Sequence, residues 1–188
     1  MSESPAEHFE HAEHAEHASL LGDPFLMRVS VTIAILAVVA ATVGSLETLE
    51  TAAAMNAKNT AVLLQNQATD NWNFYQAKSI KKNLYAIAAA NAGPQADDFK
   101  NQAERYGKDE EELFAKGKIL EQQTEEKLHE SEGHEHRHHI LTAAVTFLHV
   151  AIAIATISII MRGQRWPWYT ALVLGALGSI GAAYAYLS

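Results

Sequence analysis

The fold is decided by the segment Ala92-Gly93-Pro94-Gln95-Ala96-Asp97-Asp98, which divides a long polar stretch, residues 46–139, into two arms. Glycine suits the position just after a helix, and proline cannot continue the helical hydrogen-bond ladder. The two acids that follow suit the N-terminus of a new helix. The segment therefore predicts a helical hairpin with its turn at residues 93–94.

The first arm contains neither glycine nor proline from Glu47 to Ala92 and favours a helix throughout. Such a helix would extend about 69 Å. Its large apolar residues are sparse, and Asn and Gln fill much of its middle, so it needs a partner. We interpret the central aromatic residues Trp72, Phe74 and Tyr75 as packing against the second arm, because aromatic side chains at helical spacing usually pack.

Large side chains recur every seven residues along the second arm, at Phe99, Tyr106, Leu113 and Leu120. A seven-residue repeat is typical of a coiled-coil seam, the row of side chains that faces the partner helix. The alternate seam positions hold weaker residues, namely Ala103, Glu110, Gly117 and Thr124. The pattern predicts an antiparallel, coiled-coil-like hairpin whose seam is imperfect.

Three apolar blocks flank this hairpin, and each reaches the roughly 20 residues that a membrane-crossing helix needs. They are residues 25–46 before the hairpin, and 140–161 and 168–187 after it, the last two joined by a short basic loop at 162–167. The expected fold class is an all-α membrane protein with three transmembrane helices and an extramembrane hairpin, residues 47–139, between the first and second. Small residues would allow close helix contact in the bilayer at Ala37/Ala41, Ala151/Ala155 and Gly175/Gly178/Gly181.

Three spans would place the two ends of the chain on opposite sides of the lipid bilayer. Basic residues near span ends favour the cytoplasmic side, and the short loop carries Arg162 and Arg165. We therefore expect this loop and the N-terminal tail, residues 1–24, in the cytoplasm, and the hairpin on the other side.

Composition and motifs exclude several classes of function. The chain has no cysteine, which rules out disulfides, zinc–thiolate sites and thiol nucleophiles. Its formal net charge of −8 argues against a nucleic-acid binder. It also lacks a phosphate-binding loop, a glycine-rich dinucleotide loop and the usual hydrolase motifs. We therefore predict that the protein is not an enzyme and carries no cofactor.

Histidines form two clusters next to glutamates. One comprises His8, His11, His14 and His17 in the tail, and the other comprises His134, His136, His138 and His139 before the second apolar block. Imidazole with carboxylate suits a divalent metal such as zinc, nickel or copper. The alternative is a solvated, pH-responsive polar collar, because these runs lack the fixed spacing of a tuned site. A membrane span between the clusters would keep them as two separate sites.

His149 lies inside the second apolar block, where an ionisable side chain is costly and often marks a path for protons or metal ions. The alternative is a neutral imidazole hydrogen-bonded to a Ser or Thr of a neighbouring helix, and Thr146 lies one turn away on its own helix. The second and third blocks contain no carboxylate, which argues against a proton relay.

The first arm also carries the pattern Asp-x-Trp-x-x-Tyr-Gln-Ala-Lys-x-Ile-Lys, with Trp72, Tyr75, Gln76 and Lys78 at its centre. This pattern resembles the signature of an uncharacterised bacterial membrane-protein family that is catalogued as a domain of unknown function. The order of apolar and polar segments along the whole chain is similar as well. The resemblance implies the bacterial inner membrane, and hence a periplasmic hairpin, but it supplies no catalytic residues.

Two functional hypotheses follow from the sequence. The first is a non-enzymatic, membrane-anchored coiled-coil scaffold that forms a homo-oligomer, because an imperfect seam needs further helices to complete it. In this hypothesis the hairpin is also the surface for any protein partner. The alternative is a metal-handling or ion-conducting membrane protein that uses His149 and the histidine clusters.

Overall fold

The computed structural model describes residues 24–91, 93–161 and 164–187. Within them it contains helix α2 at Pro24–Asn91, a 3₁₀ turn η1 at Gly93–Gln95, helix α3 at Ala96–Ile160 and helix α4 at Trp166–Tyr184. Each of the two long helices includes one apolar block and one arm of the polar stretch. The all-helical class and the packing of two long helices against each other are confirmed.

The helix ends have simple local causes. Gly93 adopts a positive φ of 54°, a conformation that glycine reaches at little cost, and it follows the end of α2 closely. Asp97 and Asp98 occupy the first turn of α3, where carboxylates favour the positive end of the helix dipole. Helix α4 begins at Trp166, two residues before the expected block, because Pro167 fits a first turn, where no backbone donor is needed.

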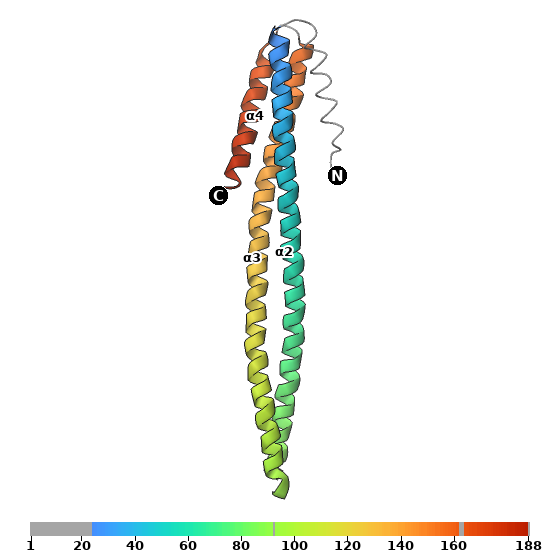
Figure 1. The fold of residues 1–188 in the computed structure, drawn as a ribbon, viewed down its shortest axis with the longest axis vertical. Coiled ribbons are helices and arrows are strands. Elements are labelled where there is room, and N and C mark those ends of the chain that lie inside the picture. The colour runs from blue at the N-terminus through green and yellow to red at the C-terminus, as the bar shows by residue number, and fades with distance from the viewer. Residues whose placement is uncertain (1–23, 92, 162–163, 188) are drawn as a thin grey trace. The chain divides into compact units, whose positions relative to one another are not determined.

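The chain divides into two compact units. Among the described residues, the apolar unit contains 24–53, 133–161 and 164–187, and the arm unit contains those between Ala54 and Glu132. Within each unit α2 and α3 run antiparallel and lie side by side, as Figure 1 shows.

The core of the apolar unit draws on all three helices. Its buried members include Val29, Ile33, Leu36 and Ala40 of α2, Leu141, Ala144, Leu148 and Ala151 of α3, and Ala171 and Ala182 of α4. Helix α4 packs through its glycines. A Cβ added at Gly175 would lie 2.5 Å from a methyl carbon of Leu36, and one at Gly178 would lie 2.9 Å from the carbonyl oxygen of Ala144. Close contact through small residues is how helices pack in lipid.

Two of the three small-residue faces expected from the sequence are therefore used inside the chain. Ala151 and Ala155 are fully buried and Gly175 and Gly178 are buried, whereas Ala41 is exposed. These covered faces cannot contribute to contact between copies of the chain.

Two helical stretches in the described part of the chain, Pro24–Asn91 and Gly93–Ile160, are long and apolar enough to cross a membrane. This finding rests on length and composition. Helix α4 is not among them, because Trp166, Pro167, Trp168 and Tyr169 and several glycines dilute its aliphatic content. A third membrane span stays a prediction.

In the arm unit, α3 packs through the two rows that the seven-residue spacing predicts. Gly117, Leu120 and Thr124 are buried, and the other five seam positions are half-buried. Glu111 and Glu112, which lie between seam positions, are exposed. The predicted register of the second arm is therefore the packed register.

The packed face of α2 matches the expected one only in part. It is made mainly of small residues, with Ala54, Ala57, Ala61 and Ala68 all buried. Phe74 was expected in the seam, but its side chain is 62% exposed, so that prediction is wrong. Trp72 and Tyr75, which were expected there as well, are half-buried and lie against Phe114 of α3, whereas the step of about 100° per residue along a helix turns Phe74 outward.

Candidate functional site

Trp72 lies at the centre of an aromatic clasp, which we define as Trp72, Tyr75, Phe114, Gly117 and Glu121. The indole nitrogen of Trp72 donates to Oε1 of Glu121 at 3.0 Å. Tyr75 and Phe114 meet the indole edge-on, with ring centroids 5.4 and 5.6 Å away. The ring covers Gly117, where an added Cβ would lie only 2.9 Å from two ring carbons. The clasp therefore fits a large side chain of α2 over the smallest residue of α3.

Lys78 continues the contact between the arms. Its ammonium lies 2.7 Å from a carboxylate oxygen of Asp109 and 5.1 Å from the ring centroid of Tyr106. Gln76, by contrast, is exposed. Three of the four signature residues, Trp72, Tyr75 and Lys78, thus contact the second arm, and the fourth faces outward.

Asn71 fixes the register of the two arms just before the clasp. Its buried side-chain amide donates to the backbone carbonyl of Leu113 at 2.6 Å. An amide at a coiled-coil seam favours one register over its alternatives, because a shifted register would leave the buried amide without a partner. The sequence offered no signal for this contact beyond the position of Asn71 beside Trp72.

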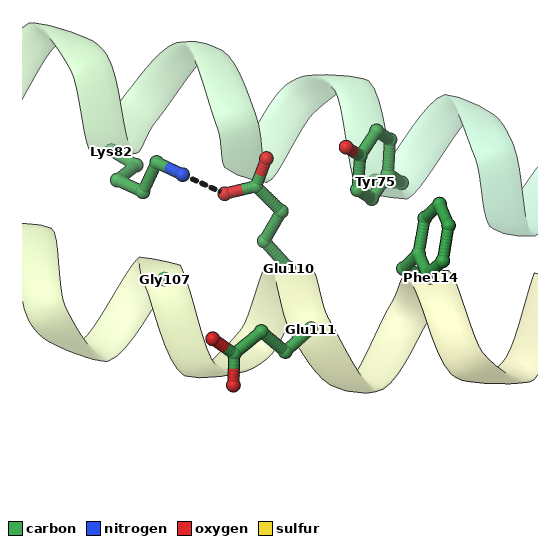
Figure 2. Close-up of a pocket in the computed structure, with 6 residues that line it drawn as sticks. All are labelled: Tyr75, Lys82, Gly107, Glu110, Glu111 and Phe114. Atoms are coloured by element: carbon green, nitrogen blue, oxygen red, sulfur yellow. Dashed lines mark hydrogen bonds and ion pairs between the residues drawn. The ribbon is translucent and has the colours of Figure 1, made fainter.

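A groove of ≈390 Å³ lies between the arms next to the clasp. Its lining residues are Tyr75, Lys82, Gly107, Glu110, Glu111 and Phe114. Figure 2 shows Glu110 reaching from α3 to pair with Lys82 of α2. Glu110 occupies a seam position, and its ion pair with Lys82 neutralises the carboxylate between the two helices.

The pKa of Glu110 is held below its usual value chiefly by the hydrogen bond from Lys82, against the opposing effect of partial burial. A further hydrogen bond from Ser79 acts in the same direction. The sequence indicated Glu110 as a weak seam position, and polar side chains of the first arm hold its carboxylate there.

A second cluster lies in the apolar unit, and we call it the polar cluster. Its members are Glu47, Glu50 and Thr51 of α2, and His134, Arg137, His138 and Thr142 of α3. Glu50 is only 8% exposed. Its Oε2 accepts from Nε of Arg137 at 3.0 Å and lies 2.6 Å from Nδ1 of His134.

Burial of Glu50 acts to raise its pKa, but the hydrogen bonds with His134 and Arg137 and the charge of Arg137 outweigh burial, so that the pKa lies below its ordinary value. One turn further toward the apolar block, a second histidine of α3 lies against a glutamate of α2, with longer distances. Nδ1 of His138 lies 3.0 Å from the hydroxyl of Thr51 and 3.7 Å from Glu47. The cluster therefore joins α2 to α3 where the apolar blocks end.

The four histidines of the predicted cluster at residues 134–139 lie on two different faces of α3. His134 and His138, one turn apart, are half-buried against α2, whereas His136 and His139 are exposed. Across the described ranges, no group of three or more His, Asp or Glu side chains is arranged to hold a metal ion. His8, His11, His14 and His17 lie outside the described residues. Metal binding stays a prediction.

His149 is half-buried on α3. The neighbouring hydroxyl of Thr146 donates to the backbone carbonyl of Thr142 at 2.8 Å, within its own helix. A role of His149 in ion passage likewise stays a prediction.

Acid should loosen the helix pairing at Glu50. A carboxyl group whose pKa is lower in the folded state than in the unfolded state stabilises the fold as long as it is ionised. For Glu50 this contribution is complete above the ordinary pKa of 4.5 and is lost as the pH falls through the lower pKa of the folded state. Hydrogen-exchange protection of the backbone at residues 47–53 and 133–138, corrected for intrinsic rates, should therefore fall between pH 5 and pH 3. In the variant Glu50→Gln, the loss of hydrogen-exchange protection between pH 5 and pH 3 should be smaller. An unchanged acid response in that variant would contradict the assignment.

These contacts define a class of protein, an all-helical protein built on a long antiparallel helix pair with polar and aromatic contacts between the helices. The chain belongs to the family described as "Domain of unknown function (DUF4337)", whose model matches residues 25–188. The resemblance to an uncharacterised family is thereby confirmed. No curated protein and no solved structure matches the chain.

Proposed function

We propose that the protein is a non-enzymatic membrane scaffold that self-associates through its helical hairpin. One observation carries this proposal. The seam of the hairpin is closed by residues of the same chain, yet large apolar side chains of α2 remain exposed, including Val62, Phe74, Ile80 and Leu84. Large exposed apolar side chains gathered on one element mark an interaction surface.

The exposed side chains of the apolar unit support membrane anchoring. Val31, Ile35 and Val38 of α2 and Val173, Leu177 and Ile180 of α4 all face outward. Helices that are apolar on their outer as well as their inner faces suit a lipid environment. We propose that α4 spans the membrane with the apolar parts of α2 and α3, in the bacterial inner membrane, with the N-terminal tail in the cytoplasm and the hairpin in the periplasm.

The polar side chains support a structural role rather than a catalytic one. In the polar cluster, Glu50 is shared by His134 and Arg137, and in the arm unit Lys78 and Lys82 pair with Asp109 and Glu110. These contacts join α2 to α3. A catalytic group, in contrast, needs access to a substrate.

Native mass spectrometry of the full chain in mild detergent tests the proposal. We expect a homo-oligomer whose mass is unchanged by a metal chelator, because the proposed contacts are apolar. A monomer at cellular concentration would overturn self-association. An oligomer that dissociates when metal is removed would instead favour the metal-handling alternative.

A further inference from the structure

The outer face of α2 in the arm unit is almost free of charge. With Ala54, Ala61 and Ala68 packed inward, the outward positions are residues 55, 56, 59, 62, 63, 66, 69, 70, 73, 76, 77, 80, 83, 84, 87, 90 and 91, and all of them are exposed. We call this surface the α2 stripe. Asp70 is its sole charged residue, and its large apolar members are Met55, Val62, Leu63, Ile80, Leu84 and Ile87.

The outer face of α3 in the same unit has the opposite character. Its exposed charged residues are Asp97, Asp98, Lys100, Glu104, Arg105, Lys108, Glu111, Glu112, Lys116, Lys118, Glu125, Glu126, Glu130 and Glu132. Nine of them are acids and five are bases, whereas the exposed charged residues of α2 in this unit are Lys58, Asp70 and Lys81, so the surface of α3 is both strongly hydrated and net negative. Such a face resists burial, and two copies of it repel each other.

The α2 stripe also carries a seven-residue repeat of its own. Its central line reads Asn59, Asn66, Asn73, Ile80 and Ile87. A seven-residue spacing keeps a row of side chains facing a partner helix along a coiled coil. The helix thus carries two rows with the same period, the alanine row that faces α3 and this second row on the opposite side.

We infer that the α2 stripe is a symmetric interface with a second copy of this chain, in which the two α2 helices lie parallel and in register; this inference rests on the proposed self-association. The stripe is nearly uncharged, so it meets its own copy without repulsion. Contact between the stripe and α3 of the other copy would instead bury charges that the stripe cannot pair.

The asparagines specify the parallel arrangement. A side-chain amide is both donor and acceptor, so Asn66 or Asn73 can pair with the same residue of the other copy. Asparagine pairs of this kind set the register of parallel coiled coils. In an antiparallel arrangement centred on Asn73, Asn66 would oppose Ile80 and Asn59 would oppose Ile87. Two copies anchored in one membrane with the same orientation also present their arms in the same direction.

Single cysteines test the interface directly, because the natural chain contains none. At a parallel, in-register twofold contact each residue on the axis meets itself, so one cysteine per chain forms a disulfide between copies. We expect oxidation in native membranes to cross-link Asn66→Cys, Asn73→Cys and Ile80→Cys. Gln65→Cys on the flank of α2 and Glu111→Cys on α3 are the matched controls, and each should cross-link at least about tenfold more slowly.

Dissociation of the oligomer gives an independent measurement. Ile80→Glu should raise the dissociation constant by about tenfold or more, because both copies then bring a carboxylate to the same place. Glu112→Gln, on the outer face of α3, should leave it unchanged. Helix content measured by circular dichroism confirms that each variant folds.

The outcomes separate this inference from the proposed function. Oligomers by native mass that cross-link through Glu111→Cys, or that fail to cross-link at residues 66, 73 and 80, would overturn the α2 interface and leave self-association standing. A monomer by native mass, with no cross-link at any position, would overturn both.

Discussion

Replacing Arg137 by leucine should lower the free energy of unfolding of the apolar unit by about 3 kcal/mol. Removal of one partner from a buried ion pair costs about 3–5 kcal/mol, because the remaining charge stays buried and loses its compensation. We expect the lower end of this range, since 34% of the Arg137 side chain is exposed and Glu50 keeps its contact with His134. Denaturant unfolding in detergent measures the loss.

The matched control is the double variant Glu50→Leu with Arg137→Leu. An apolar pair of similar volume removes the charge together with its partner, and such replacements are often neutral. The double variant should therefore recover most of the stability that the single variant loses. If Arg137→Leu alone falls within about 0.5 kcal/mol of the natural protein, the polar cluster does not stabilise the helix pair.

Two identical substitutions on α3 should change the stability of the arm unit in opposite directions. Gly107→Ala should stabilise it by about 0.5–1 kcal/mol, the usual gain from replacing a helical glycine. A Cβ at Gly107 would meet Cδ of Lys82 at an ordinary 3.6 Å. Gly117→Ala should destabilise the unit by about 1–2 kcal/mol, because overpacking at the clasp exceeds the same gain in helix propensity.

The physical reason for the difference is the immobility of Trp72. Its indole is fixed by the hydrogen bond to Glu121 and by the rings of Tyr75 and Phe114, so it cannot swing away from a new methyl group. Thermal unfolding of the two variants beside the natural protein measures both effects. Equal shifts of the same sign would mean that Trp72 does not lie over Gly117.

The second arm was predictable from sequence because its signals are local and periodic. A helix stop at Gly93 and a row of large side chains every seven residues need no knowledge of the partner helix. The packed face of the first arm was predictable only in part. Trp72 and Tyr75 pack against α3 as expected, but Phe74 does not, and much of the rest of the packed face is alanine, which is also common on exposed faces. Residue size alone does not identify the packed face of a helix when the partner helix provides the large side chains.

The contacts of the candidate site depend on pairings that no local pattern contains. Glu50 and Arg137 lie 87 residues apart, and they meet only because the hairpin turn fixes the register of α2 against α3. The sequence pointed to the histidines as a dense set, yet helical periodicity turns His134 toward α2 and His136 away from it. Gly117 looked like a defect in the seam, and its role became clear only with Trp72 above it.

The stacked pair Tyr85 and Tyr106 also bears on how the arm unit forms. Their ring centroids are 5.5 Å apart, and only 21 residues separate them in the chain, 106 − 85. The entropy lost in closing a loop grows with its length, so contacts nearest the turn form at the smallest loss. Lys78 with Asp109, and then Trp72 with Glu121, each enclose a longer segment. Tyr85 also meets Phe99, with ring centroids 6.0 Å apart and a shorter separation of 14 residues, 99 − 85. We therefore expect nucleation where Tyr85 contacts Phe99 and Tyr106, after which the contacts between the arms form progressively away from the turn.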